Sequence, residues 1–305
     1  MDILKISGLT KSFGSQVVLN NFQMQVPEHS VFGFVGPNGA GKTTTMKLIL
    51  GLLRPDEGNI MVCNEKVKYG ETKTNRYIGF LPDVPEFYNY MKPQEYLKLC
   101  GQITGLEKRE IKEKSAELLE LVGLSKVNKR IGGFSRGMKQ RLGIAQALIN
   151  EPRLLICDEP TSALDPLGRK EILDLLSVVR KKTTVLFSTH ILSDVERICD
   201  QVLVINKGQA VLAGTLSEIR AHHRHNTYLL EFATIKEAEK FTTREELKNK
   251  NILVIKKEKT VTIKLKEKTV DGVFLLKVLS QMGIVPLKFL QVEPSLEDLF
   301  EEVIK

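Results

Sequence analysis

Residues 36–44, Gly-Pro-Asn-Gly-Ala-Gly-Lys-Thr-Thr, decide the fold class of this chain. The apolar run Val31–Val35 precedes them, and a helical pattern of apolar residues follows from Met46. A strand, a glycine-rich loop ending in Lys-Thr and a helix form the context in which this spacing binds nucleotide phosphates. The alternative is an ordinary glycine-rich turn, but every fixed position of the motif is present. The segment therefore predicts an α/β nucleotide-binding fold.

The residue types of this loop follow from its chemistry. Glycine allows the backbone to turn so that N–H groups face phosphate oxygens, and the start of the helix adds positive potential. Lys42 is expected to reach the β- and γ-phosphates of ATP, and the hydroxyl of Thr43 is expected to bind Mg²⁺. The expected nucleotide-binding residues of the loop are Gly36, Pro37, Asn38, Gly39, Ala40, Gly41, Lys42, Thr43 and Thr44.

The composition is that of a globular protein with room for about two domains. Of its 305 residues, 42% are hydrophobic and 27% are charged. No stretch approaches the roughly 18 apolar residues of a membrane-spanning helix, and the first residues lack the pattern of a signal peptide. The four cysteines have no C-x-x-C spacing, which indicates reduced thiols. We therefore expect a cytoplasmic protein.

The net charge of +8 raises the question of a nucleic-acid partner. The basic residues are spread along the chain without a dense run. We interpret the excess as a mildly basic surface and expect no nucleic-acid partner.

Residues 1–220 are predicted to form one domain of alternating strands and helices. Several strand-like runs are continuous and apolar, as in strands covered on both faces. From about residue 83 to 150 the period becomes helical, which predicts a helical subdomain within the α/β core. The predicted helices there are Pro93–Gly101, Arg109–Val122 and Arg136–Ile149. The predicted strands are Ile3–Leu9, Val17–Val26, Val31–Val35, Tyr77–Leu81, Leu154–Cys157, Thr184–Ser188, Val202–Ile205 and Gln209–Ala213.

Residues 221–305 are predicted to form a small second domain. Its order of elements, β-α-β-β-α-β, is that of a ferredoxin-like α+β unit. The predicted elements are the strands Tyr228–Phe232, Ile252–Ile255 and Thr260–Leu265, the extended segment Ile284–Gln291, the helices Lys236–Leu247 and Val273–Met282, and a closing helix over Leu296–Ile304.

A second chemical feature is Leu-Leu-Ile-Cys-Asp-Glu-Pro at residues 154–160. An apolar strand ending in two carboxylates places both at the carboxyl edge of a sheet, where ligands of α/β folds bind. Asp158 is suited to hold Mg²⁺ through water, and Glu159 is suited to orient an attacking water and take its proton. An Asp-Glu pair after a strand is common by itself. Together with the loop at 36–44, it predicts nucleotide hydrolysis.

Three further segments identify a family. Phe-Ser-Arg-Gly-Met-Lys-Gln-Arg at 134–141 opens a helix before the Asp158–Glu159 strand, Ser-Ala-Leu-Asp at 162–165 follows that strand, and Phe-Ser-Thr-His at 187–190 ends the next. With the loop at 36–44, they resemble the ATP-binding subunit of a bacterial ABC transporter over residues 1–220. The 135–141 variant and the tail at 294–300 resemble exporter-type ATPases, including bacitracin, multidrug and copper-maturation relatives.

The resemblance implies roles for residues outside the glycine-rich loop. Ser135 and Gly137 would contact the γ-phosphate held by a second copy, and Asp165 would line the seam between the copies. A serine hydroxyl and free N–H groups at a helix start suit an anion. Phe13 would stack on adenine, with ordinary core packing as the alternative.

Three residues, in two motifs, depart from the usual family pattern. Arg136 and Met138 stand where the signature usually has Gly and Gln, and Asp83 stands where the Q-loop usually has Gln. Arg136 is open to two interpretations, a phosphate contact or an ion pair at the seam. Asp83 is expected near Mg²⁺ and the nucleotide, and the alternative is an exposed loop acid.

The implied mechanism is ATP hydrolysis between two cassettes, in a homodimer or a heterodimer. Lys42, Glu159 and His190 would be the catalytic residues, although a satisfied core histidine is the ordinary reading of His190 alone. A separate multi-span membrane permease, docked near residues 83–100, would convert dimer closure and opening into export. The protein would then lie on the inner face of the cell membrane.

Three rival functions fit the sequence less well. A ribosome-acting ABC ATPase would normally carry two cassettes in one chain. A DNA-repair relative would need long coiled coils between the two motifs, where roughly 90 residues are present here. A small-molecule kinase would have no use for residues 134–141 or for His190.

Overall fold

The computed structural model describes the chain except residues 223–225, 249–251, 266–271, 293–295, 298–299 and 301–305. The chain divides into two compact units, Met1–Leu216 and Ser217–Lys305. Each unit has its own hydrophobic core. Within the described residues, every helix is too short or too polar to cross a membrane.

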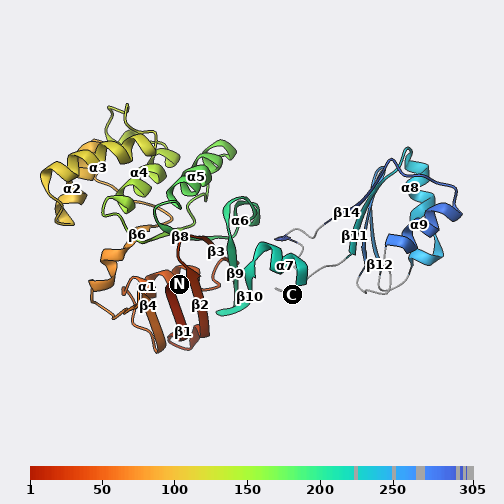
Figure 1. The fold of residues 1–305 in the computed structure, drawn as a ribbon, viewed down its shortest axis with the longest axis horizontal. Helices are drawn as coiled ribbons and strands as arrows, with labels where there is room; N and C mark the ends of the chain where they lie inside the picture. Colours follow the sequence, from red (N-terminus) through yellow and green to blue (C-terminus); the bar gives the residue numbers. More distant parts are fainter. Residues whose placement is uncertain (223–225, 249–251, 266–271, 293–295, 298–299, 301–305) are drawn as a thin grey trace. The chain divides into compact units, whose positions relative to one another are not determined.

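The centre of the first unit is a six-stranded, largely parallel sheet (Figure 1). Its strands are β3 (Val31–Val35), β6 (Ile78–Leu81), β7 (Leu154–Asp158), β8 (Thr184–Thr189), β9 (Gln201–Asn206) and β10 (Gln209–Thr215). They lie in the order β10-β9-β3-β8-β7-β6. All pairs are parallel except β10 with β9. Every residue of β3, β7 and β8 is buried, which accounts for their continuous apolar sequences.

Three helices belong to the segments that connect these strands: α1 (Lys42–Ile49), α5 (Pro166–Val179) and α6 (Leu192–Ile198). Helix α7 (Leu216–His222) follows β10 and belongs to the second unit from Ser217 onward. Helix α1 begins directly after the glycine-rich loop and lies against β7, and α6 lies against β3 and β8. This arrangement brings the loop beside the carboxyl ends of β7 and β8, where the acidic residues lie.

A second, antiparallel sheet lies beside the first and has the order β2-β1-β4-β5. Its strands are β1 (Asp2–Phe13), β2 (Gln16–Pro27), β4 (Glu57–Val62) and β5 (Glu65–Lys66). One hydrophobic core is shared by both sheets. The sequence analysis missed β4 and β5 because the first three residues of β4 are exposed and β5 has only two residues, so neither shows an apolar period.

The helical part of the first unit contains α2 (Pro93–Ile103), α3 (Lys108–Leu121) and α4 (Arg136–Leu148), as predicted to within two residues at either end. Two short 3₁₀ helices, η1 (Lys73–Tyr77) and η2 (Ile131–Gly133), precede β6 and α4. Helix α4 packs closely on β6, because a Cβ added at Gly79 would lie 2.1 Å from the carbonyl oxygen of Ala147.

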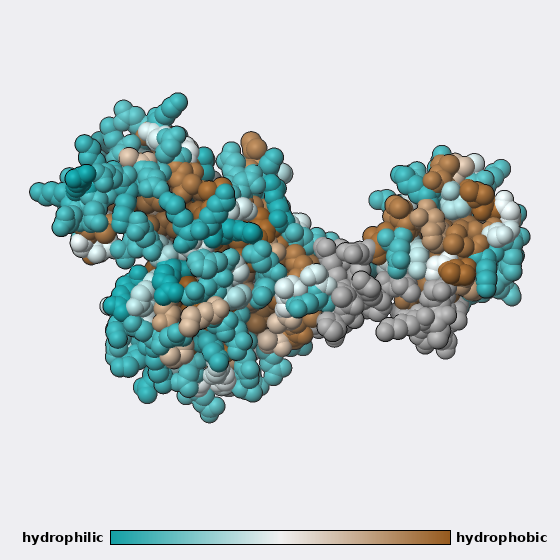
Figure 2. Space-filling view, viewed as in Figure 1, coloured by the Kyte–Doolittle hydropathy of each residue, from teal (hydrophilic) through white to brown (hydrophobic). Residues whose placement is uncertain are grey.

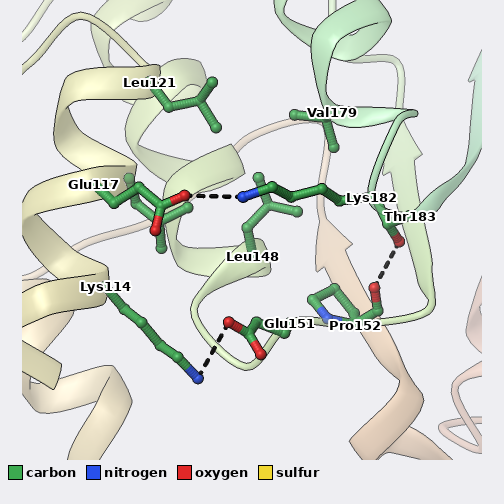
Figure 3. A pocket seen from close by; sticks show the side chains of 10 residues that line it. Lys114, Glu117, Leu121, Leu148, Glu151, Pro152, Val179, Lys182 and Thr183 are labelled. Carbon is green, nitrogen blue, oxygen red and sulfur yellow. Dashed lines mark hydrogen bonds and ion pairs between the residues drawn. The ribbon is translucent and has the colours of Figure 1, made fainter. Parts of the chain in front are cut away.

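A cavity of about 420 Å³ lies where the helical part meets the rest of the unit (Figure 3). Two ion pairs border it, Glu117–Lys182 at 2.9 Å and Lys114–Glu151 at 3.4 Å. At least one partner of each pair is largely exposed, so each pair contributes at most about 1 kcal/mol. Its apolar lining consists of Leu118, Leu121, Leu148, Pro152 and Val179. This junction is therefore bridged by weak ion pairs rather than filled by side chains.

The second unit is a four-stranded antiparallel sheet with two helices on one face (Figure 1). Its elements are β11 (Asn226–Glu231), α8 (Ile235–Thr242), η3 (Glu245–Leu247), β12 (Ile252–Lys257), β13 (Thr260–Leu265), α9 (Gly272–Gln281) and β14 (Lys288–Val292). The strand order β12-β13-β11-β14 places β13 between β11 and β12, which is the split β-α-β arrangement of a ferredoxin-like unit. Burial alternates strictly along β13, as its sequence predicts.

Two predicted elements of this unit have different limits. The helix predicted over Lys236–Leu247 ends at Thr242, where the hydroxyls of Thr242 and Thr243 donate hydrogen bonds to the carbonyls of Glu239 and Lys240. Such bonds from a threonine hydroxyl to the preceding turn compete with continued helix. The extended segment forms a strand only from Lys288. The predicted closing helix falls mostly outside the described residues.

Candidate functional site

The glycine-rich loop between β3 and α1 has the backbone that its sequence predicts. Gly39 and Gly41 have φ of 80° and 113°, in the left-handed region that favours glycine. A Cβ at Gly41 would lie 2.9 Å from Leu19 Cδ2, and one at Gly36 would lie 2.4 Å from the carbonyl oxygen of Ile205. These contacts leave no room for a larger residue at either position. The loop thus presents its backbone at the start of α1.

Lys42 is the first residue of α1, and only 6% of it is exposed. Its amine donates hydrogen bonds to the carbonyl oxygens of Gly36, at 2.6 Å, and Pro37, at 3.3 Å. It also lies 3.3 Å from Glu159 Oε1. A nearly buried ammonium group is therefore held over the loop with an acidic partner beside it.

Asp158 ends β7 and is held by two hydroxyl groups. Thr43 donates to its Oδ2 at 2.9 Å, and Ser188, on the neighbouring strand β8, donates to its Oδ1 at 2.6 Å. Asp158 is 4% exposed. A carboxylate beside a threonine hydroxyl is an oxygen donor set of the kind that binds Mg²⁺.

Glu159 follows Asp158 in a left-handed backbone conformation, with φ of 48°. Its N–H donates to the carbonyl oxygen of Ser188 at 3.2 Å and lies 3.1 Å from the hydroxyl oxygen of the same residue. The carboxylate is 2.9 Å from His190 Nδ1 through Oε2. Its Oε1 is buried without a hydrogen-bond partner in the described residues, although Lys42 is near it. A buried acceptor with spare capacity is the group expected of a base that takes a proton.

These side chains meet in a cleft of about 550 Å³. Phe13, about half exposed, forms one edge of the cleft, and Asp83 another. The lining residues are Phe13, Gln16, Val18, Asn38, Gly39, Gly41, Lys42, Thr43, Thr44, Asp83, Asp158 and Glu159. Phosphate oxygens suit the loop and Lys42, and a divalent cation suits Thr43 and Asp158. The cleft therefore fits a magnesium-bound nucleotide.

Several predicted site residues lie elsewhere. Gly36, Pro37 and Ala40 belong to the loop but are not among the residues that line the cleft, and His190 contacts Glu159 without being part of the lining. Ser135, Gly137 and Asp165 are also absent from the described residues that line the cleft.

Ser135 and Asp165 have local structural roles that the sequence analysis did not anticipate. Ser135 precedes α4 and accepts a hydrogen bond from Met138 N at 3.2 Å. Asp165 precedes α5 and accepts one from Gly168 N at 3.1 Å. Both side chains therefore cap helices. Both residues are exposed, so these caps remain accessible from outside.

The sequence analysis missed two supporting residues. Ser188 bridges Asp158 and Glu159, as described above. Asp194, on α6 and 2% exposed, accepts hydrogen bonds from Thr161 and Arg169, both at 2.7 Å. Ser188 could have been found, because a polar residue near the end of an apolar strand lies at the same sheet edge as Asp158. No comparable signal exists for Asp194, whose partners are 25 and 33 residues away.

The cysteines take no part in this site. All four are free, and burial, with a smaller effect of Asp158, raises the pKa of the Cys157 thiol. Burial also raises the pKa values of Cys63, Cys100 and Cys199. The four side chains therefore stay protonated thiols at neutral pH, as the sequence analysis expected of reduced cysteines.

Comparison with known proteins gives matches in both units. Residues 19–162 match the ABC transporter family model, and residues 214–304 match the model of the ATP-binding protein DrrA1-3-like C-terminal domain. An uncharacterized ABC transporter ATP-binding protein of Bacillus subtilis (strain 168), YxlF, is 40% identical over 303 residues, which is 99% of each chain. This chain belongs to the family of ABC transporter ATP-binding proteins.

The bacitracin transport ATP-binding protein BcrA of Bacillus licheniformis is another relative, 36% identical over 318 residues, 99% of this chain and 97% of BcrA. A solved dimer of the ATP-binding cassette MJ0796, described as a post-hydrolysis state bound to ADP and Pi, has a TM-score of 0.63 and 26% identity. It covers 70% of this chain and 98% of that one. The predicted family and fold class are thus confirmed, and the chain is an ATP-binding, ATP-hydrolysing subunit of an ABC transporter.

Proposed function

We propose that this ABC ATPase closes on a second cassette around two MgATP molecules and thereby powers export through a separate multi-span permease. The observation that carries the proposal is the position of Ser135 and Gly137. They lie at the exposed start of α4, outside the cleft formed by the glycine-rich loop of their own chain. A hydroxyl and N–H groups at a helix start favour an anion. A second copy would supply that anion as the γ-phosphate of its ATP.

Each composite site would use the residues of the cleft for binding. Lys42 would exchange its loop carbonyl partners for the β- and γ-phosphates, because phosphate oxygens are stronger acceptors for an ammonium group. Phe13 would stack on the adenine, and Asp165 would line the seam between the cassettes. Thr43 and Asp158, with Asp83 nearby, would hold Mg²⁺, which would neutralise charge on the phosphates.

Hydrolysis would depend on Glu159 and His190. Glu159 would accept the proton of the water that attacks the γ-phosphorus, while the bond from that phosphorus to the bridging oxygen of ADP breaks. His190 Nδ1 would hold the carboxylate in position through the contact at 2.9 Å. The other face of His190 would meet the γ-phosphate, since about half of its side chain is exposed.

An exposed aromatic segment supports docking of a membrane partner near residues 83–100. Val84, Tyr88 and Tyr90 are each more than half exposed. The rings of Phe87 and Tyr88 both pack against the ring of Tyr96, which places the segment against α2. On the face drawn in Figure 2, much of the surface of the first unit is hydrophilic, and apolar side chains gather around α4 and α5 and near β9. The protein would therefore lie at the inner face of the cell membrane, bound through its permease.

The decisive test is Glu159→Gln in the full chain. This variant should bind ATP with near-parental affinity, lose about 10²- to 10⁴-fold in hydrolysis rate, and accumulate as a dimer with ATP and Mg²⁺. Light scattering after gel filtration measures the mass, and phosphate release measures the rate. Glu113→Gln, an exposed carboxylate on α3, is the matched control and should behave like the parent. Hydrolysis by Glu159→Gln at the parental rate would refute the assignment of the base.

A further inference from the structure

Two of the three residues at which this chain departs from the family pattern, Asp83 and Arg136, contact each other. Arg136, at the start of α4, lies 3.3 Å from Oδ1 of Asp83, which follows just beyond the end of β6, although 53 residues separate them. Neither of the two interpretations of Arg136 from the sequence included this contact within one chain. The pair connects the segment that holds Ser135 and Gly137 to the nucleotide cleft, because Asp83 also lines that cleft.

The backbone of Asp83 is fixed more firmly than its side chain. Gln140, fully buried on α4, donates from Nε2 to the carbonyl oxygen of Asp83 at 2.7 Å. By contrast, the side chains of Arg136 and Asp83 are 42% and 46% exposed. Rotation about the side-chain bonds can therefore move the carboxylate while α4 keeps its hold on the main chain. A single exposed ion pair is weak enough to be exchanged for a stronger partner.

The stronger partner would be a cation that binds with the nucleotide in the cleft that Asp83 lines. The residue borders two hollows, the nucleotide cleft with Thr43 and Asp158, and a second one with Arg136 and Lys139. A carboxylate prefers a divalent cation to one exposed guanidinium group, since both charge and ligand geometry favour the metal.

We propose that the Asp83 carboxylate is a positioning group shared between Arg136 and MgATP, so that nucleotide binding releases Arg136. Without nucleotide, the ion pair ties the start of α4 to the cleft. When MgATP binds, Asp83 turns toward the metal and leaves Arg136 free at the surface beside Ser135. The ion pair thereby couples nucleotide binding in the cleft of one chain to the start of α4, which contacts the other cassette. This inference rests on the proposed function, because it assumes MgATP in this cleft.

The test is a double-mutant cycle of Arg136 and Asp83 in the full chain. The measured quantity is the affinity for mant-AMPPNP, a fluorescent non-hydrolysable ATP analogue. The protein is diluted until it is monomeric. Arg136→Gln removes the competing charge while it keeps a long polar side chain. It should tighten binding in the presence of Mg²⁺ by about two- to fivefold, the size expected when one exposed ion pair stops competing. It should have no effect in EDTA. In the Asp83→Gln background, Arg136→Gln should change nothing in either condition.

Two further variants control the cycle. Arg136→Lys keeps the positive charge and should bind like the parent. Arg197→Gln breaks a similar exposed pair, Arg197–Asp174 at 2.9 Å, which lies outside the cleft lining, and it should also bind like the parent.

Three results would overturn the inference. Arg136→Gln could bind the analogue more weakly than the parent, which would make Arg136 a direct phosphate contact, or it could bind with the same affinity. Arg136→Gln could also change the affinity equally in the parent and in the Asp83→Gln background. If the parent binds the analogue and Glu159→Gln forms the ATP-dependent dimer, such a result removes only this inference. If the parent fails to bind the magnesium complex, the proposed function fails with it.

Discussion

Lys42 places a positive charge in the cleft, although only 6% of the residue is exposed to solvent. Its two carbonyl acceptors belong to the loop itself, so the charge is held in place before any phosphate is bound. The protein thus keeps oriented the ammonium group that we propose binds phosphate, so little reorganisation would be required on binding.

Lys42→Ala should lower ATP affinity by about 10- to 100-fold, because hydrogen bonds to a charged group contribute about 1.5–3 kcal/mol. Isothermal titration calorimetry with ATP measures the change. Lys47→Ala, on the exposed side of the same helix, is the control and should leave affinity unaltered. Equal affinity of Lys42→Ala and the parent would exclude Lys42 as a phosphate ligand.

Ser188 acts at the same scale, but through other residues. Its hydroxyl donates a hydrogen bond to Asp158 and accepts one from the N–H of Glu159, so it sets the position of two acidic residues. Ser188→Ala should reduce kcat by about 10- to 100-fold, the usual effect of losing a group that orients a metal ligand, because we propose that Asp158 is such a ligand. Steady-state kinetics at varied Mg²⁺ should also show a higher Mg²⁺ requirement. Ser177→Ala, which removes a hydroxyl that bonds only within α5, should leave both quantities unchanged.

At the scale of elements, the contact between α4 and β6 determines where the signature segment, residues 134–141, lies. Gly79 on β6 allows the close approach, since any side chain there would strike the main chain of α4 at Ala147. Gln140 adds the buried hydrogen bond to Asp83 just beyond the strand. Helix α4 is therefore held at this end by a close approach of two backbones and a buried hydrogen bond.

Gly79→Ala should destabilise the first unit by about 1–3 kcal/mol, the usual cost of adding a methyl group to a packed contact. Urea unfolding followed by circular dichroism measures the free energy of unfolding. Gly133→Ala provides the comparison, because its nearest neighbour to an added Cβ is a lysine side chain at 3.8 Å. If the two variants unfold at the same urea concentration, the packing of α4 on β6 is looser than described.

At the scale of the whole molecule, the chain consists of two units with separate cores. The second core packs residues of β11, β13, α8 and α9 together, with Phe241 and Leu275 fully buried. All the residues that form the nucleotide cleft belong to the first unit.

The fragment 217–305 should therefore fold by itself and unfold cooperatively on heating, and the fragment 1–216 should bind ATP with an affinity close to that of the full chain. Calorimetry of both fragments measures these properties. Gradual, non-cooperative unfolding of 217–305 would show that its core requires the rest of the chain.

Much of this structure could be predicted because its signals are local. Local sequence was sufficient for the glycine-rich loop, the buried strand before it and the Asp158–Glu159 pair. Each is formed by residues close in sequence, so the period of apolar residues and the spacing of the motif predict it. Weakly patterned elements such as β4 escaped prediction, because pairing with β1 rather than their own apolar period makes them strands. The helix over 236–247 was predicted too long because hydroxyl bonds at Thr242 and Thr243 end it.

The sequence by itself determined the glycine-rich loop, the acidic pair and the family, since the residues of each motif are close together in the chain. Only the tertiary structure decided which distant groups meet: Ser188 with Asp158, Lys42 with Glu159, and Arg136 with Asp83. These pairs are 30 to 117 residues apart, and their contact depends on strand order and helix packing. No local period carries that information, because the same local elements could be joined in other orders.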